Sequence, residues 1–132
     1  MNFRRAVFAA VFAVSLAAAP AFAQQQQNQP NDDQSQSRLR GDQWYAEQLT
    51  ELAQVLGGAH YLRILCQGRG DQRWRDYMRG VIDREPQYNQ QLVEGFNRGY
   101  RDQEARFPVC DTTAQQTEAE LRARGLRVSR GL

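Results

Sequence analysis

Apolar side chains between Asp42 and Gln67 recur at spacings of three and four residues, which is the repeat of one face of an α-helix. Asp42 is suited to cap the start of this helix. Gly57-Gly58 lies inside it, although a glycine costs about 1 kcal/mol relative to alanine in a helix interior. The pair predicts either a kink or a close approach by another helix, and Gly95 and Gly99 again suggest close packing. The apolar stripe consists of Tyr45, Leu52, Val55, Ala59, Leu62 and Cys66, widened by Leu49 and Leu56.

Two further amphipathic stripes follow a Gly-Arg-Gly turn at residues 68–70. Asp71 is expected to cap the first of these helices, which ends by Glu85 because the residue before Pro86 avoids helical geometry. Pro86 is well placed to begin the next helix, and Pro108 is expected to end it. The stripes are Trp74, Tyr77, Met78, Val81 and Ile82 in the first helix, and Tyr88, Leu92, Val93, Phe96, Tyr100 and Phe107 in the second.

A fourth helix is expected to begin at Thr112, which with Gln115 fits a capping box. It is expected to run to about Arg124 and to stop at Gly125. Its apolar face is thin, because it offers little beyond Ala114 and Leu121. No segment shows the period-two alternation of a β-strand. The chain is therefore predicted to be all-α, a small helical bundle of about four helices.

The N-terminal segment has the order of features that defines a secretory signal peptide. Arg4 and Arg5 precede an apolar run over residues 6–19, and Ala21-Phe22-Ala23 offers a cleavage site between Ala23 and Gln24. The run is shorter than the roughly 20 residues of a membrane-spanning helix, so an uncleaved anchor is the less favoured alternative. Cleavage predicts an exported, periplasmic protein with no stable membrane insertion.

The rest of the chain divides into three predicted parts. Residues 24–40 are rich in glutamine and begin with a stretch without large apolar side chains, which is typical of a disordered spacer. Residues 41–126 are predicted to form the helical domain, and residues 127–132 a flexible tail. All 17 basic residues are arginines; two lie in the signal peptide, which leaves 15 against 15 acidic residues. A neutral mature chain argues against nucleic-acid binding, which needs a basic excess.

Cys66 and Cys110 are the two cysteines of the chain. An oxidising compartment favours their pairing as a disulfide, and no CxxC redox motif is present. Metal binding would need three or four ligands, and His60 is the one histidine, so no metal or cofactor is expected. In the chain-entropy model a bridge of this span contributes roughly 4 kcal/mol, and it would pin the weak fourth helix to the first. A reactive thiol is the alternative.

Catalytic patterns are missing from the predicted domain. No serine occurs between Gly41 and Arg124, and the chain has no HExxH motif and no glycine-rich phosphate loop. Seven of its carboxylates are expected to face solvent: Glu47, Glu51, Asp76, Asp83, Glu94, Asp102 and Glu104. The chain is therefore predicted not to be an enzyme, although composition alone leaves a two-carboxylate hydrolase open. His60 is expected to be partly buried and hydrogen-bonded. The candidate partner or buried polar contacts are His60, Trp44, Asn97 and Arg98.

The stretches "LAQVLGGAHYLRILC", "DQRWRDYM" and "FNRGYR", with Cys110 before a threonine-bearing helix start, resemble a family of small exported alphaproteobacterial proteins carried as a domain of unknown function. The resemblance covers about residues 43–126. It implies a signal peptide, two separated cysteines expected to pair and no assigned activity, and it supplies no catalytic residues.

The leading functional hypothesis is a non-enzymatic periplasmic helical module that binds a protein partner of the cell envelope with help from the glutamine-rich spacer. Its supports are the predicted export, the missing nucleophiles and the arginine-rich surface. The alternatives are an acid-stress or envelope-stress chaperone and a thiol-active periplasmic protein.

Overall fold

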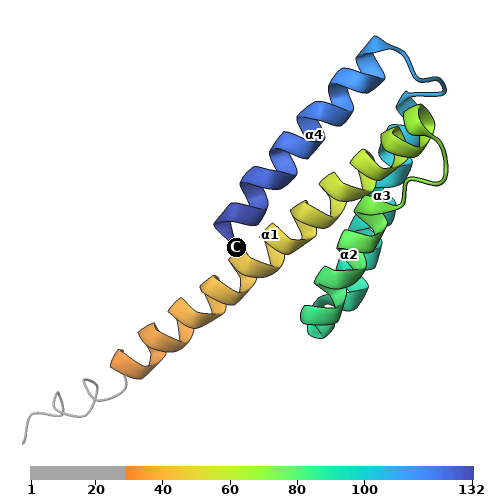
Figure 1. Cartoon of the computed structure of the whole chain (residues 1–132). Helices are drawn as coiled ribbons and strands as arrows, with labels where there is room; N and C mark the ends of the chain where they lie inside the picture. Colours follow the sequence, from red (N-terminus) through yellow and green to blue (C-terminus); the bar gives the residue numbers. More distant parts are fainter. Residues whose placement is uncertain (1–28) are drawn as a thin grey trace, which may run out of the picture.

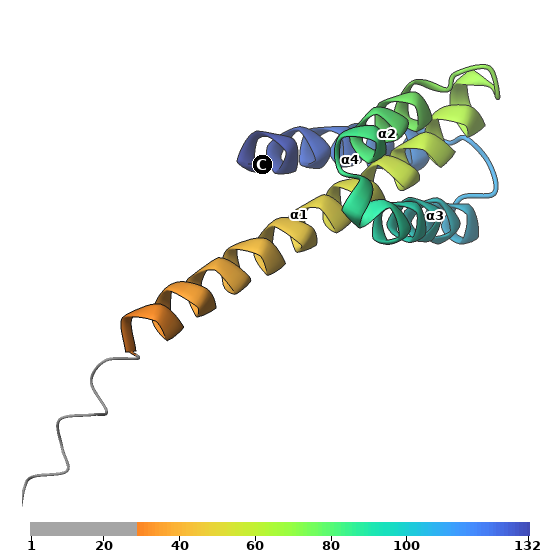
Figure 2. The same ribbon diagram turned by 90° about the horizontal axis from the view of Figure 1, so that it is seen from below.

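The computed structural model describes residues 29–132, and this part of the chain contains helices and no strand. The elements are α1 (Gln29–Gln67), α2 (Arg73–Arg84), a short 3-10 helix η1 (Pro86–Tyr88), α3 (Asn89–Arg106) and α4 (Thr112–Gly131). The long α1 is the central element; α2 and α3 pack on one side of it and α4 lies along another (Figures 1 and 2). The predicted all-α bundle of about four helices is confirmed. The predicted signal peptide, with its Ala23–Gln24 cleavage site, lies outside the described residues.

Helix α1 begins earlier than the sequence predicted. The structure places residues 29–40 in the helix, whereas the sequence predicted a disordered spacer and a helix start at Asp42. A proline is tolerated in the first turn of a helix, and no proline or glycine lies between Pro30 and Gly41. Residues 32–40 are all exposed and project beyond the bundle (Figure 1). Residues 32–40 therefore contribute no buried side chain to the bundle; residues 24–28 of the predicted spacer are not among those described.

The core is built around the buried face of α1, whose first buried side chain is Leu49. The larger of two apolar clusters receives residues from all four α-helices, and the smaller lies at the end where α1 and α3 finish and α4 begins. The larger cluster contains Leu49, Leu52, Ala53, Leu56, Met78, Val81, Leu92 and Val128, and the smaller contains Tyr61, Leu62, Phe107 and Ala114.

Glycines allow α1 and α3 to pack backbone to backbone. A Cβ on Gly57 would overlap the carbonyl oxygen of Phe96, and a Cβ on Gly99 would overlap the carbonyl oxygen of Gln54. Helix α1 is continuous through Gly57 and its neighbour. Of the two alternatives that the sequence left open, close helix approach is therefore the one that the structure shows.

Helix α4 differs from the prediction at both ends. Its N-cap is Asp111, whose carboxylate accepts a hydrogen bond of 2.7 Å from the backbone N–H of Ala114, rather than Thr112. The helix continues to Gly131, so the predicted stop at Gly125 and the flexible tail at 127–132 are wrong. The physical reason is that Gly125 is buried against α1. Val128, which is 9% exposed, then extends the apolar stripe by almost another turn.

The start of α2 also departs from the prediction. Gln72 is the N-cap residue and makes no side-chain capping bond. The Asp71 carboxylate, which was expected to cap this helix, accepts a hydrogen bond of 3.4 Å from the backbone N–H of Arg73, the first residue of α2. It also forms ion pairs with Arg63 at 2.8 Å and with Arg73 at 3.0 Å. Its side chain therefore ties the start of α2 to α1.

Candidate functional site

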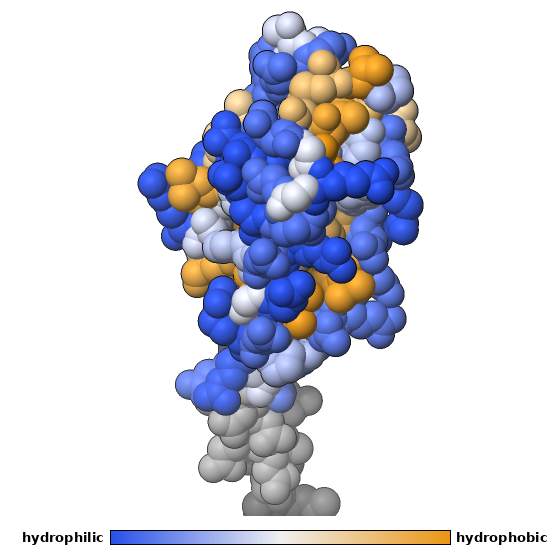
Figure 3. All heavy atoms as spheres, turned by 45° about the vertical axis from the view of Figure 1, so that its right-hand side comes forward, coloured by the Kyte–Doolittle hydropathy of each residue, from blue (hydrophilic) through white to orange (hydrophobic). Residues whose placement is uncertain are grey.

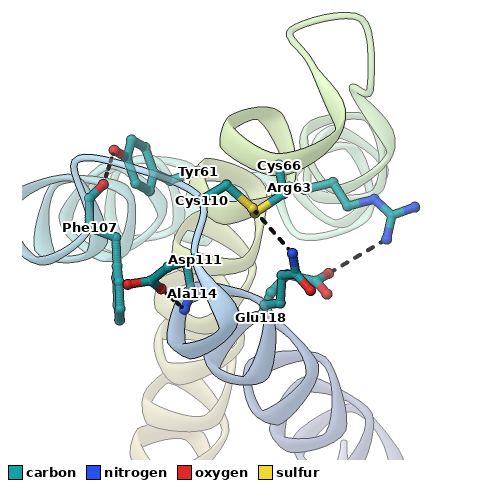
Figure 4. Close-up of a disulfide and its surroundings, with 9 residues drawn as sticks. Tyr61, Arg63, Cys66, Phe107, Cys110, Asp111, Ala114 and Glu118 are labelled. Carbon is teal, nitrogen blue, oxygen red and sulfur yellow. Dashed lines mark hydrogen bonds and ion pairs between the residues drawn. A yellow bond between two sulfur atoms is a disulfide. The ribbon is translucent and has the colours of Figure 1, made fainter.

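The end of the bundle opposite the α1 extension is closed by the Cys66–Cys110 disulfide (Figure 4). Cys66 lies in the last turn of α1 and Cys110 in the connection between α3 and α4, with their Cα atoms 5.2 Å apart. Tyr61 Oη donates a hydrogen bond of 2.6 Å to the carbonyl oxygen of Phe107 beside the bridge. The predicted disulfide is confirmed, and because it takes up both cysteines, neither is a free thiol in this structure.

An ion-pair network surrounds the bridge. Arg63 on α1 lies 2.8 Å from Asp71 and 3.7 Å from Glu118 on α4, and Arg122 lies 3.0 Å from Glu118 (Figure 4 shows the Arg63–Glu118 pair). The hydrogen bond from Arg63 lowers the pKa of Asp71, because it stabilises the carboxylate. Because Asp71 also pairs with Arg73 of α2, the network joins α1, α2 and α4 and has the character of a structural clamp.

A cleft of about 640 Å³ lies between α2 and α3, with α1 as its floor. Helix α2 packs on α1 and has very little backbone contact with α3, so the facing sides of α2 and α3 do not cover each other. The lining residues are His60 and Ile64 from α1, Arg69 and Gln72 from the turn, Arg75, Met78, Arg79 and Ile82 from α2, and Val93, Phe96, Asn97 and Tyr100 from α3.

His60 forms a polar point in the floor of this cleft. Its side chain is 5% exposed, its ring lies 5.7 Å from the ring of Phe96 and 6.1 Å from that of Tyr100, and its buried Nδ1 has no hydrogen-bond partner among the described residues. Burial lowers the pKa of His60, and the positive charge of Arg75 acts in the same direction, against the opposite effects of Asp71 and Asp76. The neutral imidazole is therefore favoured. The hydrogen bond that the sequence led us to expect is missing at Nδ1.

The edges of the cleft are basic. Arg69, Arg75 and Arg79 line it, and no aspartate or glutamate does. Arg79 pairs with Asp76 at 3.2 Å, whereas Arg69 and Arg75 form no ion pair within residues 29–132. Apolar walls and guanidinium edges together suit an occupant that has an apolar face with negatively charged groups at the edges of that face.

The other predicted contact residues fall in different places. Asn97 is exposed and lines the cleft with His60. Arg98 lies beside a shallow hollow between α1, α3 and α4, next to Glu94 and Arg124. Trp44 is 49% exposed on α1, outside the cleft. The arginines and Val93 were not predicted as site residues, although the sequence contains a signal for them. Both walls repeat the spacing i, i+3, i+4, i+7, at residues 75, 78, 79, 82 and 93, 96, 97, 100.

Within residues 29–132, no group of three or more histidine, cysteine, aspartate or glutamate side chains is placed to hold a metal ion. None of the helices in this part of the chain combines the length and the apolar character needed to cross a bilayer.

The fold and its bridge thus define a small helical bundle closed by one disulfide. Over residues 44–132 the chain matches the profile of the family described as "Protein of unknown function (DUF2385)", and it belongs to that family. The resemblance to a family of unknown function is thereby confirmed. No curated protein and no solved structure matches the chain significantly.

Proposed function

We propose that the protein is a non-enzymatic binding module of the periplasm, which holds a protein partner of the cell envelope in the cleft between α2 and α3. The cleft is the observation that carries this proposal. It offers apolar side chains from two helices and a buried histidine whose Nδ1 has no hydrogen-bond partner within residues 29–132. It also offers Arg69 and Arg75, which form no ion pair in that part of the chain. Grooves between helices with apolar walls are a recurrent way to hold a segment of another protein, and arginine is enriched at interfaces.

Two features support the periplasm as the compartment. The first is the signal-peptide pattern of residues 1–23, and the second is the Cys66–Cys110 bridge, because disulfides persist in oxidising compartments. The non-enzymatic part of the proposal has separate support. Both cysteines are in the bridge, and residues 41–124 contain no serine.

Photo-crosslinking in cells tests the proposal. A photoreactive amino acid at Val93, 42% exposed in the cleft wall, is compared with one at Val109, 62% exposed in the connection between α3 and α4. The expected result is a discrete protein adduct from position 93 that is absent from position 109, in protein released by osmotic shock. Equal adducts from both positions, no adduct, or retention of the protein in the cytoplasm would contradict it.

A further inference from the structure

We infer that the partner segment held in the cleft is an amphipathic helix with carboxylates beside its apolar face, which seats between α2 and α3 as a further helix of the bundle. This inference rests on the proposed function and names the chemistry of the partner. It depends on three separate properties of the cleft: the spacing of its walls, the charge of its edges and the polar group in its floor.

The walls have the repeat of a helix-packing surface. The four residues from α2 and the four from α3 each follow i, i+3, i+4, i+7, so each wall presents two turns of one helix face, about 10 Å along the axis. Ile64 lies one turn beyond His60 in the floor. Side chains in such rows interdigitate with those of another helix, which requires little adjustment of the wall. Because Gly57 and Gly99 allow α3 to pack backbone to backbone on α1, the Phe96 wall stands directly on the α1 floor.

The edges select the sign of the charge. Arg75 and Arg79 stand one turn apart on α2, Arg69 lies near the end of the same wall, and the opposite wall contributes Asn97. A guanidinium binds a carboxylate through two parallel hydrogen bonds. Among the described residues, Arg69 and Arg75 have no ion pair to give up. Glutamates one turn apart on the incoming helix match this edge, whereas lysines at the same positions would meet like charge.

The floor favours one polar side chain in the middle of the apolar face. A buried polar atom without a partner carries a desolvation cost that a hydrogen bond from the occupant removes. His60 Nδ1 is such an atom, and because solvent does not reach it, the imidazole ring has to turn toward the cleft for an occupant to bond to it. An asparagine or serine has both a donor and an acceptor, so it can bond to either tautomer of the imidazole.

The test uses the mature chain with its disulfide intact and a synthetic peptide of about 16 residues, long enough to form a helix on binding. The peptide has leucines on one face with a central asparagine, and glutamates on both flanks of that face; its counterpart has lysine in place of each glutamate. Binding is followed by calorimetry and by backbone NMR shifts. We expect the glutamate peptide to bind at least about tenfold more tightly than the lysine peptide and to shift the amides of Phe96 and Asn97.

Matched pairs of variants test whether the arginines of α2 bind the glutamates of the peptide. The double variant Arg75→Gln with Arg79→Gln should lower the affinity for the glutamate peptide by about tenfold. The double variant Arg127→Gln with Arg130→Gln, on the exposed surface of α4, should leave this affinity unchanged. Circular dichroism confirms that both variants fold. Equal binding of the two peptides, equal effects of the two variant pairs, or no shift at Phe96 would overturn the inference.

A third probe, dodecanoate, tests whether the cleft binds a small amphiphile instead of a helix. If dodecanoate shifts the same amides and loses affinity in the α2 variant while the glutamate peptide does not bind, the cleft is a site for a fatty carboxylate and the inference is wrong. The two proposals fail separately. A protein adduct at position 93 without preferential binding of the glutamate peptide would leave the proposed function standing and remove this inference.

Discussion

Gly99 is the residue on which the spacing between α1 and α3 depends most directly, because its position leaves no room for a Cβ beside the Gln54 carbonyl oxygen. We expect Gly99→Ala to lower the free energy of unfolding by about 1–3 kcal/mol, since the helices must move apart. Gly41→Ala is the matched control, because nothing lies within 4 Å of a Cβ there. That change should be neutral or stabilising by up to about 1 kcal/mol. Urea unfolding measures both, and equal stabilities would show that α3 tolerates a wider spacing.

His60 makes the stability of the fold depend on pH. The unfolded chain binds a proton at this residue near pH 6.5, whereas burial and Arg75 lower the pKa of His60 in the folded state. Between these two pKa values the unfolded state binds more protons, so the free energy of unfolding decreases as pH falls below about 6.5 and levels off below the folded pKa. His60→Leu should remove this dependence between pH 5 and about 7.5, because the chain has no other histidine. Urea unfolding at a series of pH values provides the comparison, and identical slopes for the two proteins would contradict the prediction.

At the scale of single elements, the N-cap of α4 distinguishes the structure from the sequence-based capping box. Asp111 accepts the hydrogen bond from Ala114 N–H, so Asp111→Ala should cost about 1 kcal/mol of stability. Thr112→Ala should cost only a few tenths, because Thr112 is the first residue inside the helix. Thermal unfolding ranks the stabilities of the two variants. A larger loss of stability for Thr112→Ala would support the capping box that the sequence predicted.

The two ends of the described chain make different contributions to stability. Residues 32–40 are exposed throughout, so removing residues 24–40 should leave the free energy of unfolding unchanged to within a few tenths of a kcal/mol. Removing residues 127–132 should lower it by about 1–3 kcal/mol, because Val128 belongs to the larger core cluster. Urea midpoints of the two truncated proteins are the measurement. A neutral C-terminal truncation would support the flexible tail that the sequence suggested.

At the scale of the whole molecule, the bridge connects the end of α1 to the start of α4 across 44 residues. Replacing both cysteines by alanine should lower the free energy of unfolding by up to about 4 kcal/mol. The far half of α4 is held by Gly125 and Val128, so the loss of order should begin at residues 112–118, next to the missing bridge. Native-state hydrogen exchange should show early loss of protection there, while Leu52 and Leu92 keep theirs. Uniform loss would mean that the bundle opens as one unit.

Much of the fold was predictable because helix formation and burial follow a local repeat. Residues three and four apart share one face of a helix wherever that face packs, so the spacing identified most of the buried sides of α1, α2 and α3. The exceptions in the predicted stripes of α2 and α3 include Tyr77 and Val93, which are 45% and 42% exposed. Pro86 and Pro108 separate helices for reasons that lie in the adjacent backbone. The bridge was predictable for another reason, since two cysteines permit one pairing. Of the cleft, the sequence indicated only His60 and Asn97 among the candidate contacts.

The tertiary structure decided the rest, because the deciding neighbours are distant in the chain. Gly125 alone indicates the end of a helix. In the structure it is buried on α1, and the following turn adds Val128 to the larger core cluster, so α4 continues to Gly131. The arginines of α2 look like an ordinary solvated face in the sequence. They become the edge of a cleft because α2 and α3 both pack on α1 and not on each other, and no local spacing specifies that arrangement.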